Sequence, residues 1–373
     1  MYSPTDREIS AGTLVNRLID HQRSDWQFDR DIADGCSDYD RSNVTATLLE
    51  KMSWRAVHQT DRLAYRFLSD QSLPVALSAS VTWTYGELYE RVQAIADELA
   101  GQHKHLIGQP VLLVYSPGLE LIAAFLACLS AGAIPTLVPS PRRHESLSRW
   151  QHIMADANVA AVLTSQDLQE QIEPLLVRYR QSKAQDVKTQ DEKAQDTAAA
   201  SVFSIATDAI NCSTRSTNGV ADVTQPPREN IAFLQYTSGS TSQPKGVMVT
   251  HANLAHNLEQ IQLAFGYSDS NQGVIWLPPY HDMGLIGGIL QPLYSGYPVT
   301  LMSPTSFLRQ PSRWLEAIAH FKGTISGGPN FAYDYCLQKV SVEQCQSLDL
   351  SSWSVAFTGA ESIRAQTLRC FSE

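Results

Sequence analysis

The residues best suited to chemistry lie in one segment, Ile231–Thr250, which reads IAFLQYTSGSTSQPKGVMVT. Two apolar runs, Ile231–Tyr236 and Val247–Thr250, flank a loop rich in glycine and short hydroxylated side chains, a pattern that predicts strand, loop and strand. Gly239 and Gly246 let the backbone approach a ligand closely, and Lys245 supplies a cation. The hydroxyl donors of the loop are Thr237, Ser238, Ser240, Thr241 and Ser242. Together these groups predict a site for a polyphosphate.

The same loop admits a second interpretation, a Ser/Gly surface hairpin with a solvated lysine. It is not a Walker loop, because that motif places its lysine after the second glycine and ahead of a helix. Here Lys245 precedes Gly246, and a strand pattern follows. The residue types alone therefore leave phosphate binding and a plain hairpin both open.

A histidine and an aspartate adjoin in a second segment, Trp276–Ile289, which reads WLPPYHDMGLIGGI. Neighbouring residues on a strand point to opposite faces, so His281 and Asp282 are not expected to share a metal ion. Taken alone, His281 is interpreted as a structural histidine.

A third segment, beginning at Gly327-Gly328-Pro329, predicts a turn that enters a helix. Proline suits the first helical position, and the core side of this helix is expected to carry Phe331, Tyr335 and Leu337. A fourth segment, Leu348–Glu361, ends in Gly359-Ala360-Glu361. The residue types of these two segments do not by themselves indicate a catalytic or binding role.

The string Tyr-Thr-Ser-Gly-Ser-Thr-x-x-Pro-Lys-Gly-Val resembles the phosphate loop of the adenylate-forming superfamily. That superfamily includes acyl-CoA synthetases, luciferases and the adenylation domains of peptide synthetases. The resemblance implies that the loop grips the β- and γ-phosphates of ATP. The residues it assigns to this task are Thr237, Ser238, Gly239, Ser240, Thr241 and Lys245.

The other segments are similar to those of one branch, the fatty acyl-AMP ligases. The resemblance places His281 and Asp282 at the reacting carboxylate and Gly328 beside the substrate and nucleotide. It also implies that the alkyl chain of the substrate lies over the small residues of the second segment. Those small residues are Gly284, Gly287 and Gly288. It also implies that Gly359, Ala360 and Glu361 hold adenine. Ser362-Ile363 replaces the branch's usual Pro-Val here, which leaves the chemistry of that loop intact.

The resemblance implies that a fatty acid and ATP, with Mg²⁺, form an acyl-adenylate and pyrophosphate, with Lys245 and His281 in catalysis. The acyl group would pass to an acyl carrier protein or a polyketide or peptide synthase. One alternative is a fragment of an acyl-CoA synthetase; another is a non-catalytic remnant that only binds a ligand or partner. The branch's magnesium glutamate and C-terminal lysine are not found before Glu373. We therefore expect a truncated chain that forms no acyl-adenylate by itself.

These segments need a scaffold, and the sequence predicts an α/β one. A buried strand Val111–Tyr115, a helix Leu119–Leu129 and a strand Ile134–Val138 form a strand–helix–strand unit, typical of parallel sheets. The uncharged run Leu121–Val138 imitates a membrane span, but Ser130, Gly132 and Pro135 interrupt it. The expected fold is the large N-terminal domain of the superfamily, with stacked sheets flanked by helices, cut short.

Further elements follow from periodicity. A helix is expected from Val44, with Leu48, Leu49, Met52 and Ala56 on one face, followed by a strand Val81–Tyr85, a helix Leu88–Leu99 and a strand Ala160–Thr164. The predicted domain is 44–373, after a polar extension 1–43. Residues 181–228 are predicted to be a disordered insertion, because Lys-Ala-Gln-Asp recurs in a polar stretch, although Val202–Ile205 forms an apolar island.

Composition narrows the class of partner. The net charge of −10 is unfavourable for binding nucleic acid or an anionic membrane. The 6 cysteines are scattered without metal spacing, which is typical of reduced thiols in the cytoplasm and predicts no metal site built from them. Residues 1–30 lack the apolar segment of a secretory signal.

Overall fold

The computed structural model describes residues 46–70, 79–140, 147–188, 202–212, 226–237 and 244–373. The chain divides into two compact units. The described residues of the smaller unit, Arg364–Glu373, form helix α14 (Ala365–Ser372). The larger unit, Thr45–Ile363, carries every feature considered below. The predicted extension 1–43 lies outside the described residues.

The larger unit contains two six-stranded sheets. Sheet A has the strand order β12-β11-β9-β10-β1-β2, and sheet B has the order β6-β5-β3-β4-β7-β8. The strands of sheet A are β1 (Leu63–Leu68), β2 (Ser80–Thr84), β9 (Gly273–Ile275), β10 (Val299–Leu301), β11 (Ile325–Gly327) and β12 (Val355–Phe357). Those of sheet B are β3 (Pro110–Val114), β4 (Ile134–Val138), β5 (Ala161–Thr164), β6 (Phe203–Ala206), β7 (Ile231–Thr237) and β8 (Lys245–Thr250).

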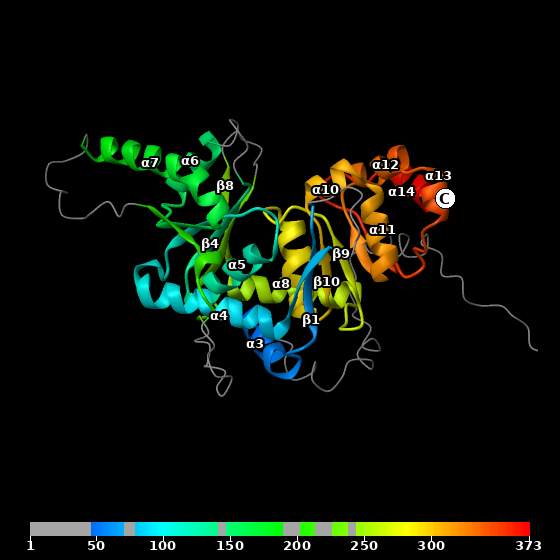
Figure 1. The fold of residues 1–373 in the computed structure, drawn as a ribbon, viewed down its shortest axis with the longest axis horizontal. Coiled ribbons are helices and arrows are strands. Elements are labelled where there is room, and N and C mark those ends of the chain that lie inside the picture. The colour runs from blue at the N-terminus through cyan, green and yellow to red at the C-terminus, as the bar shows by residue number, and fades with distance from the viewer. Residues whose placement is uncertain (1–45, 71–78, 141–146, 189–201, 213–225, 238–243) are drawn as a thin grey trace, which may run out of the picture. The chain divides into compact units, whose positions relative to one another are not determined.

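Helices cover these sheets, as the α/β prediction requires (Figure 1). The α-helices of the larger unit are α3 (Leu48–His58), α4 (Tyr85–Gln102), α5 (Leu119–Ala131), α6 (Leu147–Asp156), α7 (Gln166–Lys188), α8 (His251–Phe265), α9 (Gln291–Ser295), α10 (Pro304–Arg309), α11 (Ser312–Phe321), α12 (Asn330–Lys339) and α13 (Val342–Gln346). Shorter or irregular helices are η2 (Lys104–Leu106), η3 (Thr207–Ala209) and η4 (Met283–Leu290), the last of which is a π-helix.

Sheet B is built on the predicted strand–helix–strand unit. β3 and β4 pair in parallel, and α5 connects them. Gly132 ends α5 with φ +76°, a left-handed conformation that glycine adopts without strain. The uncharged run is therefore a buried helix followed by a buried strand, and no helix among the described residues is long and apolar enough to cross a membrane.

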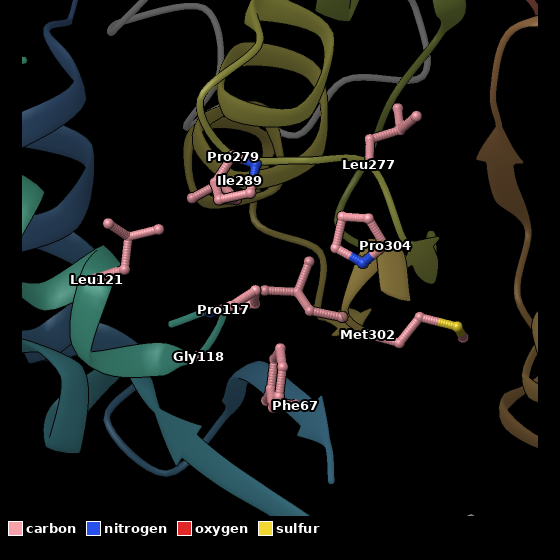
Figure 2. Close-up of a pocket in the computed structure, with 10 residues that line it drawn as sticks. Phe67, Pro117, Gly118, Leu121, Leu277, Pro279, Ile289, Met302 and Pro304 are labelled. Atoms are coloured by element: carbon pink, nitrogen blue, oxygen red, sulfur yellow. The ribbon is translucent and has the colours of Figure 1, made fainter. Parts of the chain in front are cut away.

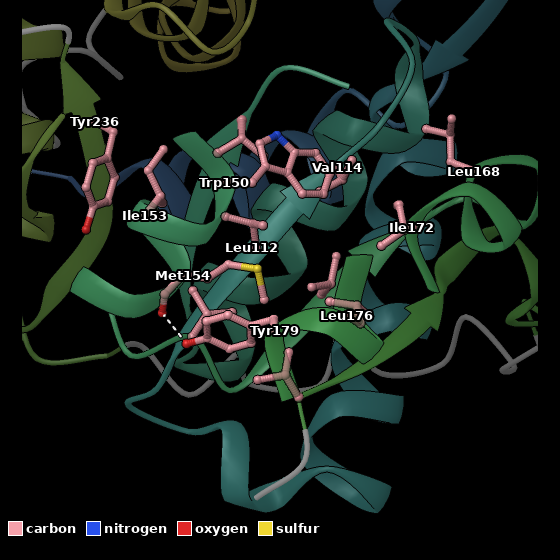
Figure 3. Close-up of a cluster of buried hydrophobic side chains, with 14 residues drawn as sticks. Leu112, Val114, Trp150, Ile153, Met154, Leu168, Ile172, Leu176, Tyr179 and Tyr236 are labelled. Carbon is pink, nitrogen blue, oxygen red and sulfur yellow. Dashed lines mark hydrogen bonds between the residues drawn. The ribbon is translucent and has the colours of Figure 1, made fainter. Parts of the chain in front are cut away.

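One face of sheet B packs against α6 and α7 (Figure 3). Trp150 and Ile153 of α6 and Ile172 of α7 meet Leu112 of β3 in a cluster of buried side chains. The indole Nε1 of Trp150 donates to the carbonyl of Pro139 at 3.2 Å. These contacts fix the rotation of α6 about its own axis, and so fix which of its polar side chains face β7 and β8.

The predicted insertion 181–228 is only partly consistent with the structure. Residues 203–206 form β6, which pairs in parallel with β5, and Val202 is buried. η3 follows, where Thr207 is fully buried and its hydroxyl donates to Glu120 at 2.7 Å. The apolar island therefore packs as expected, and the disordered range was drawn too wide, because a short edge strand needs few apolar residues. Residues 189–201 and 213–225 lie outside the described part.

Sheet A is parallel except for β2, which runs antiparallel to β1. Tyr267, Tyr297 and Ile325 form a core cluster against the sheet, with Ile261 of α8 packed on it. Trp314 of α11 is also fully buried, and its indole donates to the hydroxyl of Ser326 at 2.7 Å. Because β9, β11 and β12 are parallel, the loops that follow them leave the same edge of the sheet.

The predicted core face of α12 was wrong. Phe331 is 44% exposed and Leu337 is 47% exposed, whereas Ala332, Tyr333 and Cys336 are buried. Pro329 is the residue before the helix, with ψ 163°, so α12 starts one residue later than expected. The buried Ala332 and Cys336 each follow an expected core residue by one position, which is about 100° around the helix.

Candidate active site

The carboxyl edge of sheet A collects three of the segments that the sequence singled out. β9 leads into Trp276–Asp282, β11 leads into Gly328 and α12, and β12 leads into Thr358–Glu361. Ligands of open α/β sheets bind at this edge, where loops rather than helices receive the strand ends. The topology therefore brings together three segments that are far apart in the sequence. The second follows the first by about 50 positions, and the third follows the second by about 30.

The phosphate hairpin, defined here as β7, β8 and Pro244 directly before β8, confirms the two predicted strands. Thr237 pairs with Lys245, and Tyr236 pairs with Gly246, in an antiparallel register. A Cβ at Gly246 would come within 2.8 Å of the Tyr236 ring, so this glycine is required by packing. Lys245 is exposed and has no ion pair within the described part of the chain. Ser238, Gly239, Ser240 and Thr241 lie outside the described residues.

A hydrogen bond links the phosphate hairpin to the edge of sheet A. The side-chain amide of Gln235, two residues before Thr237, donates to the carbonyl of Tyr280 at 3.0 Å. Gln235 is buried, so this bond is protected from water. The strand that ends at the predicted phosphate site therefore contacts the residue that precedes His281.

His281 does not lie on a strand, contrary to the assumption made from the sequence. Two prolines follow the short run after β9, and His281 lies in a bend just before η4. The Asp282 carboxylate accepts the backbone N–H of Met283 at 2.7 Å and so caps η4. A π-helix is rare and occurs frequently at functional sites. The substrate-binding role predicted for Asp282 stays a prediction beside this capping role.

The pKa of His281 is lowered by desolvation of its ring. The adjacent Asp282 carboxylate raises the pKa, and the guanidinium of Arg149 lowers it further. Lowering the pKa of a histidine keeps the imidazole neutral at pH 7, with one nitrogen as donor and the other as acceptor. A neutral ring beside a carboxylate substrate can donate a hydrogen bond without fixing the carboxylate in an ion pair.

The three glycines of η4 differ in what surrounds them. A Cβ at Gly284 would lie 2.1 Å from the carbonyl oxygen of Pro278, and one at Gly288 would lie 2.7 Å from Ile275. A Cβ at Gly287 would meet nothing within 4 Å. The expectation that all three leave room for an alkyl chain is therefore corrected. The protein itself fills the space at Gly284 and Gly288, and only Gly287 borders open space.

The loop after β12 is held by the start of α12. Glu361 accepts the backbone N–H of Phe331 at 3.3 Å, and the amide of Asn330 donates to the carbonyl of Ser362 at 2.9 Å. Ala360 has φ +65°, a left-handed conformation that is uncommon for a residue with a Cβ. Such strain is found at ligand sites and persists only where surrounding contacts enforce it.

Two further contacts join this loop to the other segments. A Cβ at Gly359 would lie 3.2 Å from the methyl group of Met283, so the loop passes directly over the start of η4. A Cβ at Gly328 would lie 2.6 Å from the Trp276 ring, so Gly328 serves close packing on that indole. The predicted site residues that the structure describes therefore lie on connected segments of one unit.

Sequence reasoning missed two polar atoms at this edge. The hydroxyl of Thr358, directly before Gly359, and the indole Nε1 of Trp276 are buried and have no hydrogen-bond partner in the part of the chain that the structure describes. A buried polar atom without a partner is destabilising unless a ligand or water supplies one. Both atoms are hydrogen-bond donors that a bound nucleotide or substrate would satisfy. No spacing pattern distinguishes them, although both residues lie within the quoted strings.

An apolar cavity lies beside η4 (Figure 2). Phe67 of β1, Leu121 of α5 and Ile289 of η4 lie around it, and Pro279 places it two residues from His281. Its volume is about 20 Å³, which is room for about one water molecule. An alkyl chain would enter this cavity only if the lining side chains moved.

Residues 52–373 match the AMP-binding enzyme family. The chain belongs to this family. The match covers the phosphate hairpin, the His281 segment and the loop after β12, so it includes every described residue of the site. The α/β fold with two sheets and flanking helices agrees with that of the family's large N-terminal domain.

Two relatives of this chain are named as fatty acid ligases. The chain is 38% identical over 333 residues to the medium-chain fatty acid–acyl-carrier-protein ligase JamA of Moorena producens, covering 87% of this chain and 51% of that protein. It is 33% identical over 320 residues to the long-chain fatty acid–AMP ligase FadD32 of Mycolicibacterium smegmatis, covering 84% of this chain and 47% of that protein.

A solved structure supports the same assignment. The crystal structure of the fatty acyl-adenylate ligase from Legionella pneumophila, in complex with acyl adenylate and pyrophosphate, is similar with a TM-score of 0.73 and 37% identity. The similarity covers 90% of this chain and 53% of that chain. The chain thus spans about half the length of the relatives that it matches.

Proposed function

We propose that this chain carries the ATP- and acyl-binding part of a fatty acyl-AMP ligase. The observation that supports this most strongly is the Gln235–Tyr280 hydrogen bond of 3.0 Å. It holds the phosphate hairpin against the His281 segment, as transfer of an adenylyl group between a triphosphate and a carboxylate requires. The loop Gly359–Glu361 at the same edge would hold adenine.

The proposed reaction forms one bond and breaks another. A carboxylate oxygen of the fatty acid attacks the α-phosphorus of ATP, and the bond from that phosphorus to the bridging oxygen breaks. Pyrophosphate leaves with the electron pair. Lys245, with Thr237 and the following loop residues, would stabilise the charge that develops on pyrophosphate. His281 would donate a hydrogen bond to the carboxylate and orient it for in-line attack.

The acyl acceptor and the cellular setting are proposed from the named relatives and from the cysteines. The acyl carrier protein is favoured over CoA because JamA is named as a ligase that uses that carrier. Magnesium enters through the resemblance alone, since the described residues contain no group of three His, Cys, Asp or Glu side chains that would hold a metal ion. We place the reaction in the cytoplasm on the scattered cysteines, of which those in the described part are free thiols.

Binding of pyrophosphate to the purified chain tests this function directly. Lys245→Ala should weaken pyrophosphate and ATP binding about tenfold or more, because a charge-assisted hydrogen bond is lost. In an active enzyme completed with the remaining region, pyrophosphate exchange should fall about 100-fold. Isothermal titration calorimetry measures the first effect, and isotope exchange measures the second.

The matched control is Lys104→Ala, which removes the same charge from an exposed residue of η2. This variant should bind as the wild type does. Binding by Lys245→Ala within twofold of the wild type would contradict the assignment. It would favour a non-catalytic remnant or a plain surface hairpin instead.

A further inference from the structure

Helix α6 presents a polar face beside the phosphate hairpin. Arg149, His152 and Asp156 are spaced three and then four residues apart, so they lie on one side of the helix. Trp150, Ile153 and Met154 point into the core of sheet B and hold the helix in place (Figure 3). The three polar side chains therefore have a fixed direction, and two of them contact the phosphate hairpin.

The contacts of this face advance along the phosphate hairpin toward its loop. Asp156 accepts the hydroxyl of Tyr236 at 2.5 Å, and Tyr236 pairs with Gly246. One turn earlier, Nε2 of His152 lies 3.2 Å from the carbonyl oxygen of Pro244. Four residues of helix rise about 6 Å, and two residues of strand about 6.8 Å, so helix and strand advance together.

Arg149 lies a further three residues toward the helix start, about 4.5 Å along the axis. This step carries it past the Thr237–Lys245 pair, to the end of the phosphate hairpin where the predicted phosphate loop begins. Figure 1 shows α6 beside β8 in agreement with the His152 contact. A second observation bears on the position of Arg149. Its positive charge lowers the pKa of His281, so the guanidinium lies near that ring as well.

One nitrogen of the Arg149 guanidinium, Nε, is buried without a hydrogen-bond partner among the described residues. A guanidinium stays charged at every physiological pH and presents donors in a planar fork that fits phosphate oxygens. A buried donor without a partner is destabilising, and an anionic ligand would remove that cost.

We infer that Arg149 is a phosphate-binding residue, which contacts the polyphosphate of ATP from α6 and adds its positive charge to that of Lys245. The inference rests on the proposed function and extends it to α6. It assigns the ligand as phosphate rather than carboxylate, because both printed contacts of the same helix face are with the phosphate hairpin.

Titration of the 373-residue chain with inorganic pyrophosphate and, separately, with octanoate tests the inference. Arg149→Ala should weaken pyrophosphate binding about tenfold and leave octanoate binding unchanged. Arg149→Gln keeps much of the apolar stem without the charge. It should show the same loss, which separates removal of the charge from any disturbance of folding by removal of the stem. Arg149→Lys should recover part of the affinity, since it restores charge but not the fork.

The control is Arg178→Ala, an exposed arginine on α7 that makes the same change in net charge. Wild-type affinity in Arg149→Gln, together with a loss in Lys245→Ala, would overturn this inference and leave the proposed function standing. A loss of octanoate binding alone would also overturn it, in favour of a carboxylate site. Absence of pyrophosphate binding by the wild-type chain would overturn both.

Discussion

At the scale of single residues, Gly284 and Gly287 of η4 show that the same residue type can serve packing at one position and leave open space at another. Gly284 lets the helix start press against the backbone of Pro278, whose carbonyl oxygen lies 2.1 Å from the position a Cβ would take. Gly287, one turn on, has open space at that position. The first is required by packing, whereas the second is available to a ligand.

Alanine at these two positions should therefore have opposite effects on stability. Gly284→Ala forces a methyl group against backbone atoms that cannot rotate away, and should destabilise the protein by about 1–3 kcal/mol. Gly287→Ala should stabilise it by up to about 1 kcal/mol, because alanine favours helical backbone more than glycine does. Urea unfolding followed by tryptophan fluorescence compares the two, and equal effects would contradict this account.

Prediction from the sequence succeeded where a long run of neighbouring residues indicated the same local structure. The phosphate hairpin was placed correctly because apolar strands flank a loop of glycines and hydroxyls. The capping role of Asp282 and the left-handed Ala360 could not be predicted, since both depend on backbone conformations set by neighbouring segments. Arg149 lies 88 or more positions from the phosphate loop, and only packing of α6 on sheet B brings them together.

At the scale of elements, one ion pair anchors the segment that follows β6. Arg91 of α4 makes a two-pronged contact with Glu120 of α5, at 2.8 and 3.1 Å, and its Nη1 donates to the carbonyl of Ile210 at 2.6 Å. The side chains are 11% and 22% exposed, so water screens the pair weakly. Thr207 completes the network through its hydroxyl.

Arg91→Ala should destabilise the protein by about 2–3 kcal/mol, because Glu120 would keep its charge in a partly buried site without a cation. Thermal unfolding measures the effect, and the amide protons of residues 203–210 should exchange faster with solvent deuterium in the variant. Arg178→Ala, on an exposed surface, is the reference and should unfold as the wild type does. Unchanged exchange at 203–210 would show that β6 is held by its strand partner alone.

The elements that the sequence predicted well were those with long apolar patterns. β3, α5 and β4 agree with prediction to within one or two residues, because their side chains are almost all buried. β6 was recognised only as an island, since it has four residues, of which two are small, and it pairs on one side only. An edge strand of this length carries too little pattern to be separated from the polar residues around it.

At the scale of the whole molecule, buried titratable groups limit stability at both ends of the pH range. Burial lowers the pKa of His251, the first residue of α8, from 6.5, and desolvation lowers that of His281. The unfolded chain then binds more protons than the folded one below about pH 6.5, so the histidines favour folding above that pH and oppose it below. Burial raises the pKa of Tyr65, Tyr115 and Tyr297, so these favour folding below about pH 10 and oppose it above.

The free energy of unfolding should therefore fall from pH 7 to pH 5 and again above pH 10. His251→Gln should flatten the acid slope, because a residue that must stay neutral in the folded state is removed. His256→Gln, on the exposed face of the same helix, is the matched control. Chemical denaturation at a series of pH values measures both slopes, and an acid slope unchanged in His251→Gln would contradict the assignment.

The outer position of β8 links ligand binding to association between molecules. β8 is the last strand of sheet B among the strands that the structure describes, and its Val247 and Met248 are 49% and 66% exposed. An open strand edge of this kind is a template on which a second extended chain can add, and a lysine at the edge is a common natural deterrent. Lys245 holds that position at the first residue of β8. An anion that neutralises Lys245 would remove the deterrent. Binding of a polyphosphate at this lysine would therefore favour association between molecules through β8.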